Sequence, residues 1–138
     1  MILVDTSVVI DFLKGMQNPK VELFDDILGK KVPWGINEFI FQEVLQGAKD
    51  KEEFERLREY LNTIPFYSLK YQRQSFERAA MIYFNCRRAG VTIRSTIDIL
   101  IAETAIENDV AILHNDEDFD HMGEIVKELK IYKEKPIL

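Results

Sequence analysis

Short apolar runs and longer amphipathic segments alternate along the chain. Residues 2–4 and 110–113 are continuous apolar runs, the pattern of strands that are buried on both faces of a sheet. Apolar residues at 32, 34 and 36 predict another strand, which Pro33 places at a sheet edge or at the start of the strand. Further strands or extended connections are predicted at residues 64–69 and 129–132.

Helical periodicity fills the segments between these runs. Ser7 predicts the cap of a short helix over residues 8–14, with Gly15 as its stop. Asn37 predicts the cap of a helix that ends near Gln46, and a cap signature at Ser95 predicts a helix over residues 98–108. Further helices are predicted at residues 49–61, 71–89 and 122–128.

This order of elements predicts the fold class. Strands that alternate with helices, and that are apolar throughout, indicate an α/β protein whose mainly parallel central sheet is covered on both faces. Ligands of such sheets bind outside the carboxyl ends of the strands. Side chains that directly follow a predicted strand are therefore the first candidates for a functional site.

Composition sets the class of protein. With 138 residues, 46% of them hydrophobic and 30% charged, the chain resembles an ordinary globular domain, and we expect a single domain over residues 1–138. Cys86 is the only cysteine, so no intrachain disulfide can form and a reducing, cytoplasmic setting is favoured. No apolar run approaches the roughly 20 residues needed to cross a bilayer, and we expect no membrane contact.

Charge is unevenly distributed. The chain has a net charge of −6, yet residues 69–97 hold six basic residues and one acidic residue, a balance of +5 that leaves −11 for the rest. This segment is either a solvated helix face or a surface that contacts phosphates. Its candidate phosphate contacts are Arg73, Arg78, Arg87, Arg88 and Arg94.

Four acidic residues stand at positions that favour chemistry. Asp5 and Asp116 follow predicted strands, and Asp98 begins a helix that could return to the same sheet edge. Glu43 lies inside a helix among apolar neighbours, where a solvated carboxylate is not expected. Taken singly, each has a structural explanation: an Asx turn, a capping box with Ser95, or the rim of a helix.

The stretch HNDEDFD, residues 114–120, is a second unusual feature because it places four acids in seven positions after a buried strand. The stretch either contributes to a cation site or is only a polar loop with an Asx turn. We expect His114, at the strand end, to satisfy a backbone group rather than to transfer protons.

Together the acids indicate a cation site. Carboxylates that converge on one cleft repel one another unless a divalent cation binds them. A set of oxygen ligands without a His or Cys cluster suits Mg²⁺ or Mn²⁺ better than Zn²⁺. The expected chemistry is metal-assisted attack of water on a phosphodiester.

Four motifs resemble those of PIN domains, most closely the small VapC-like toxins. They are VDTS at residues 4–7, QEVLQGA at 42–48, TIDILIA at 96–102 and LHNDEDF at 113–119. The resemblance spans essentially the whole chain. Asn37 stands where many relatives have Ser or Thr, although it can still cap the helix.

The resemblance implies a PIN-like three-layer α/β/α sandwich and an Mg²⁺- or Mn²⁺-dependent endoribonuclease that acts on RNA, such as tRNA or another structured RNA. It also implies a homodimer and inhibition by a VapB-like antitoxin. By the match of motifs, the acidic quartet is Asp5, Glu43, Asp98 and Asp116. Of these, Asp5, Asp98 and Asp116 would bind the metal, with Glu43 and Asp118 as secondary ligands. Thr6, Ser7 and Asn115 would position water or substrate, and Arg73, Arg78, Arg87, Arg88 and Arg94 would contact the RNA backbone.

Two other functions remain open from the sequence. A PIN-like module could bind RNA or a protein partner without cutting, although such modules are expected to lose some of the acids. A phosphate-handling enzyme of the haloacid dehalogenase type would use Asp5 as nucleophile, but that mechanism usually has a second Asp where this chain has Ser7.

Overall fold

The computed structural model describes residues 1–133, and the predicted domain bounds of 1–138 therefore include residues 134–138 outside the described range. Within it, strands β1 (Ile2–Val4), β2 (Trp34–Gly35) and β3 (Ala111–Leu113) form a parallel sheet in the order β2-β1-β3. Isolated bridges join Ile36 to Phe66 and Ile112 to Ile131. The segments predicted as strands at 64–69 and 129–132 thus contribute only single bridges.

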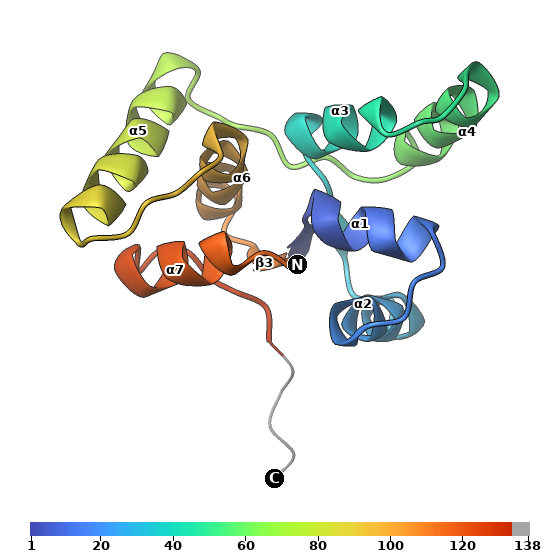
Figure 1. The fold of residues 1–138 in the computed structure, drawn as a ribbon, viewed down its shortest axis with the longest axis horizontal. Coiled ribbons are helices and arrows are strands. Elements are labelled where there is room, and N and C mark those ends of the chain that lie inside the picture. The colour runs from blue at the N-terminus through green and yellow to red at the C-terminus, as the bar shows by residue number, and fades with distance from the viewer. Residues whose placement is uncertain (134–138) are drawn as a thin grey trace, which may run out of the picture.

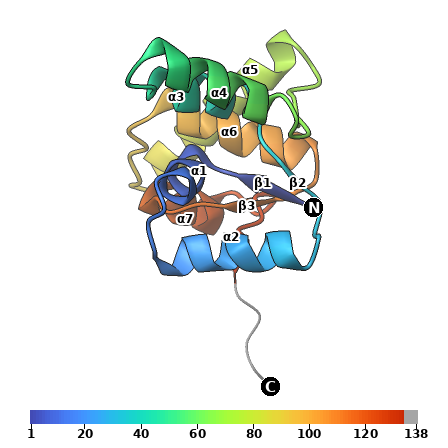
Figure 2. The ribbon, with the colours of Figure 1, turned by 90° about the vertical axis from the view of Figure 1, so that its right-hand side faces the viewer.

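Helices cover both faces of the sheet. Figure 2 shows α2 on one side of the strands and α6 on the other, with α3, α4 and α5 beyond it, so the predicted three-layer architecture is confirmed. In Figure 1, α5 and α7 flank α6 at one end of the molecule while α1 and α2 lie at the other. The helices are α1 (Thr6–Leu13), α2 (Pro19–Gly29), α3 (Glu38–Gln46), α4 (Lys51–Leu61), α5 (Arg73–Arg88), α6 (Thr96–Glu107) and α7 (Glu117–Ile125).

Two helical predictions need correction, and one helix is missing from them. The N-cap of α1 is Asp5, whose carboxylate accepts from the Ser7 backbone, so the predicted Ser7 cap is wrong. Helix α7 begins at Glu117 rather than at residue 122, because Asp116 caps it. Helix α2 was not predicted at all, although Asn18 followed by Pro19 is a strong start signal and an apolar residue recurs at every third position.

Helix α6 is the buried centre of the fold. All seven residues from 99 to 105 are buried, including the polar Glu103 and Thr104. The Asn37 amide donates to the Thr104 hydroxyl at 3.1 Å, and its oxygen caps α3 by accepting from Ile40 N at 2.9 Å. This buried contact fixes α3 against α6, and thereby fixes the two helices that carry Glu43 and Asp98.

Cys86 is fully buried on α5, in agreement with a core role. Within the described residues, no helix is long and apolar enough to cross a membrane.

Glu103 and Glu107 form a carboxyl pair one turn apart on α6. Burial, reinforced by the hydrogen bond and the charge of Glu107, raises the pKa of Glu103 to about 8. Burial also acts on Glu107, but hydrogen bonds from Glu103, the Lys70 backbone and Ser75 hold its pKa below the ordinary value. Glu103 therefore carries a proton at neutral pH, and its protonated carboxyl group donates a hydrogen bond to the Glu107 carboxylate.

We predict that this pair makes stability fall as pH rises. The folded pKa of Glu103 lies above its ordinary value, so its contribution is complete below about pH 4.5 and is lost as pH approaches 8. The Glu103→Gln variant keeps a donor to Glu107 and cannot ionise. Urea unfolding should therefore show a smaller loss of stability between pH 5 and about 8.5 for the variant than for the natural chain. Equal losses would contradict a protonated Glu103.

Candidate metal centre

Asp5 lies at the carboxyl end of the central strand. Its backbone N–H donates to Leu113 O at 2.9 Å, which aligns the ends of β1 and β3. Its carboxylate Oδ2 accepts from Ser7 N at 3.1 Å and from Ser7 Oγ at 2.7 Å. The other oxygen, Oδ1, is buried without a hydrogen-bond partner among the described residues. An unpaired buried carboxylate oxygen is costly unless a cation satisfies it.

Glu43 approaches the same region from α3. The Thr6 hydroxyl donates to Glu43 Oε1 at 2.7 Å, a contact between residues 37 positions apart. It fixes the carboxylate of α3 against the first turn of α1. The side chain of Glu43 is half-buried, as its apolar neighbours in the sequence indicated.

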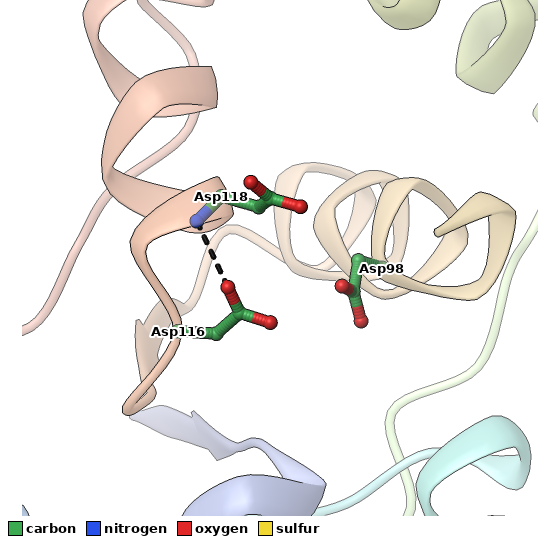
Figure 3. A group of neighbouring side chains, drawn as sticks. All are labelled: Asp98, Asp116 and Asp118. Carbon is green, nitrogen blue, oxygen red and sulfur yellow. Dashed lines mark hydrogen bonds between the residues drawn. The ribbon is translucent and has the colours of Figure 1, made fainter. Parts of the chain in front are cut away.

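Three further carboxylates meet where α6 and α7 begin. One oxygen each of Asp98, Asp116 and Asp118 lies within 4.8 Å of the others (Figure 3). Asp98 sits in the first turn of α6, where Ser95 Oγ accepts from its backbone N–H at 3.3 Å. Asp116 is the N-cap of α7, and its Oδ1 accepts from Asp118 N at 3.0 Å.

Burial and the charges of neighbouring acids raise the pKa of two of these carboxyl groups. Burial is the main cause of the raised pKa of Asp98, about 7, and the charges of Asp5, Asp116, Glu43 and Asp118 add to it. Burial likewise raises the pKa of Asp5 to about 6, with a contribution from Glu43, against the opposing hydrogen bonds from Ser7. Five carboxylates therefore share one electrostatic site.

A divalent cation fits these residues. Within residues 1–133, no Lys or Arg side chain forms an ion pair with any of the five acids. The ligands are carboxylate oxygens alone, which suits Mg²⁺ or Mn²⁺. Asp5 Oδ1 has no hydrogen-bond partner among the described residues, and the neighbouring carboxylates repel Asp98. Both observations indicate that a cation would complete the site.

The structure places the predicted site residues with unequal closeness. The resemblance makes Asp118 a secondary metal ligand, yet its side chain is 5% exposed and belongs to the group of three with Asp98 and Asp116. Asp5 and Glu43 are not in that group, and their charges act on the pKa of Asp98. Asn115 contributes its backbone, which donates to Ser7 Oγ at 3.0 Å, while its side chain is exposed.

The basic residues lie at different distances from the acids. Arg94 is adjacent, since its backbone N–H lies 3.4 Å from Asp118 Oδ2. Arg78 instead acts on Glu103 and Glu107, on the part of α6 that leads away from Asp98. Glu107 lies nine positions after Asp98, which corresponds to about 14 Å along the helix. All five candidate arginines are exposed.

Comparison with known proteins identifies the family. A family model described as the PIN domain matches residues 2–125. The chain belongs to the PIN domain family. It is 34% identical over 126 residues to VapC ribonuclease Mb1587 of Mycobacterium bovis and to Ribonuclease VapC11 of Mycobacterium tuberculosis, an alignment that covers 91% of this chain and 93% of each relative.

Solved structures agree with this PIN fold. A chain in the crystal structure of VapBC2 from Rickettsia felis bound to a promoter DNA fragment matches with a TM-score of 0.70 and 17% identity, over 96% of this chain and 98% of that one. A chain of VapBC-1 from nontypeable Haemophilus influenzae also matches with a TM-score of 0.70, at 18% identity, over 96% and 97%. At such identities the likeness shows the fold of the PIN domain.

Repulsion in the acidic site predicts a stabilising substitution. The pKa of Asp98 is raised to about 7, so its ionisation removes stability as pH rises toward 8. Without divalent cations, Asp98→Asn should therefore raise the melting temperature at pH 8, with a gain that shrinks toward pH 5. Each pKa unit corresponds to about 1.4 kcal/mol, discounted here for partial exposure.

Thermal unfolding checks this expectation. The control is Asp25→Asn on an exposed position of α2, which should leave the melting temperature nearly unchanged. Added Mn²⁺ should stabilise the natural chain more than the Asp98 variant. A destabilised Asp98→Asn protein at pH 8 would show that the carboxylates do not repel.

Proposed function

We propose that this PIN domain is a metal-dependent endoribonuclease that hydrolyses RNA phosphodiester bonds and acts as the toxin of a toxin–antitoxin pair. The observation that carries the proposal is the acidic site, in which carboxylates from three helix starts and one helix interior converge. Its relatives at 34% identity are named ribonucleases, which supports RNA as the substrate class.

Asp98, Asp116 and Asp118 would hold Mg²⁺ or Mn²⁺, with Asp5 as a further ligand through its unpaired Oδ1. When bound, the cation supplies positive charge that stabilises negative charge developing on the phosphate. Glu43 uses Oε1 to accept from Thr6, which leaves its other oxygen to orient an attacking water. Ser7 holds Asp5 with its hydroxyl and also accepts from Asn115 N, so it fixes the two edges of the site together.

The partners follow from the same proposal. The chain would pair with a VapB-like antitoxin, form a homodimer and act in the cytoplasm on tRNA or another structured RNA. The fold shared with chains of VapBC complexes supports the toxin assignment. An Arg of the antitoxin could pair with the carboxylates in the place of the metal, since carboxylates bind guanidinium strongly.

Cleavage of RNA tests the catalytic proposal. We expect purified protein to cut RNA with Mg²⁺ or Mn²⁺, EDTA to abolish cutting, and Asp5→Asn or Asp98→Asn to reduce the rate by at least about 100-fold. Asp25→Asn, the exposed control, should cut normally. Gel analysis of the products, followed by sequencing of their ends, would name the cleavage site.

A non-catalytic RNA- or partner-binding module is the alternative function. It would retain RNA binding in EDTA and give no products with either metal. Normal cutting by a folded Asp5→Asn/Asp98→Asn double variant would refute the role of the acids.

The exposed arginines are proposed as contacts with the RNA backbone. They are Arg73, Arg78, Arg87, Arg88 and Arg94. The guanidinium groups of Arg87 and Arg88 lie 5.6 Å and 5.7 Å from the ring centres of Tyr83 and Phe84, which limits their mobility. Such a surface would position the substrate while the acidic site cuts it.

We predict that replacing Arg87 and Arg88 with Gln weakens RNA binding and lowers its dependence on salt. Each lost phosphate contact should reduce the slope of log affinity against log salt by about 0.7 for a single strand. The matched control is Arg56→Gln/Arg58→Gln, which removes two exposed charges from α4. Fluorescence anisotropy with labelled RNA in EDTA measures both. An unchanged slope would make Arg87 and Arg88 a solvated face.

A further inference from the structure

His114 connects the end of β3 to the acidic site. The side chain is 2% exposed, and the ring packs against Phe119 with centroids 5.1 Å apart. Asp116 N donates to its Nδ1 at 3.1 Å, and its Nε2 lies 3.2 Å from Asp120 Oδ1. As expected from the sequence, this histidine satisfies a backbone group.

These contacts define its tautomer. A backbone N–H can only donate, so Nδ1 accepts and the ring proton resides on Nε2. The carboxylate of Asp120 is an acceptor for that proton. The buried ring of His114 thus presents one acceptor inward to Asp116 and one donor outward to Asp120.

We propose that His114 is a positioning residue for the metal centre, and that its Nδ1 atom aims the carboxylate of Asp116 at the cation. This inference rests on the proposed metal dependence. It assigns to His114 no contact with substrate, because the ring is enclosed and both of its nitrogens are engaged.

Side chains hold the backbone of the turn that carries Asp116. Two consecutive backbone N–H groups are held by side chains: Asn115 N donates to Ser7 Oγ, and Asp116 N donates to His114 Nδ1. Asp116 then uses Oδ1 to cap α7, and Figure 3 shows its other oxygen turned toward Asp98. With the backbone and one oxygen both fixed, the remaining oxygen has a defined direction. Loss of the acceptor at Nδ1 would release the backbone N–H of Asp116.

Asparagine and glutamine separate the two halves of the ring. His114→Asn places an amide oxygen near the position of Nδ1 and lacks the outer donor. His114→Gln places an amide N–H₂ near the position of Nε2 and lacks the inner acceptor. Both variants lose the ring contact with Phe119, and Asn, the smaller side chain, leaves the larger void. Packing alone therefore predicts weaker binding by Asn, whereas the hydrogen bond predicts weaker binding by Gln.

Mn²⁺ binding, followed by electron paramagnetic resonance of the free ion, tests the inference on folded protein. We expect the natural chain and His114→Asn to differ by no more than about threefold in Mn²⁺ affinity, and His114→Gln to bind at least about tenfold more weakly. Asp120→Ala, which removes only the outer partner, should bind like the natural chain. Equal weakening of the Asn and Gln variants, or normal binding by Gln, would overturn the proposal.

A second measurement needs no variant. Proton–nitrogen correlation spectra of the natural chain, without metal, should show Nδ1 of His114 unprotonated and Nε2 protonated; the reverse pattern would overturn the proposal. If the Mn²⁺ series behaves as expected while the natural chain fails to cut RNA, the proposed function is wrong and the role of His114 stands. If the natural chain cuts RNA but Asn and Gln bind Mn²⁺ alike, only the role of His114 is wrong.

Discussion

Repulsion among carboxylates at one edge of the sheet is the constraint on which the rest of the structure depends. The charges of four acids there add to the raised pKa of the fifth, Asp98, and no Lys or Arg side chain among the described residues forms an ion pair with any of them. Neutral donors hold four of them: the Thr6 hydroxyl holds Glu43, and Ser7 holds Asp5. The backbone N–H groups of Asp118 and Arg94 hold Asp116 and Asp118. Hydrogen bonds of this kind stabilise the charged forms without neutralising the site, which leaves room for a cation.

The parallel sheet supplies the geometry for this arrangement. Val4 pairs with Leu113, so the residues after β1 and β3 emerge side by side at the carboxyl ends of the strands. Asp5 N donates across to Leu113 O, and the next turns of both segments meet through Ser7 and Asn115. Helices α3 and α6, which carry Glu43 and Asp98, are positioned by side-chain contact instead: the buried Asn37–Thr104 hydrogen bond fixes α3 against α6. Strand pairing and one interior amide thus bring together acids that are far apart in sequence.

The sequence predicted those parts of the fold that local signals specify. Continuous apolar runs located β1 and β3, and the caps at Asn37 and Ser95 located α3 and α6. The missed α2 had an Asn-Pro start and an apolar residue at every third position, so its signal was present. The start of α7 was hidden because acids that cap and begin a helix also resemble a polar loop. The closeness of Asp118 to Asp98 could not be read locally, since it depends on how α7 packs beside α6.

Two groups of acids in this chain solve the same electrostatic problem in different ways. Glu103 is buried on α6 beside the partly exposed Glu107, and there one proton removes the repulsion, with its position set by donors from Ser75 and the Lys70 backbone. At the sheet edge, Asp98 and Asp116 remain partly exposed, so an ion from solvent can reach them. Protonation would also relieve the repulsion at this edge, but it would remove the lone pairs that a cation needs. The pKa of Asp98 is about 7, so a proton and a metal ion compete for this carboxylate near neutral pH. The pKa of Glu103 is about 8, so Glu103 keeps its proton there. The Glu103–Glu107 pair therefore relieves its repulsion with a proton that fixed donors locate, whereas the acids at the sheet edge are available to bind an ion.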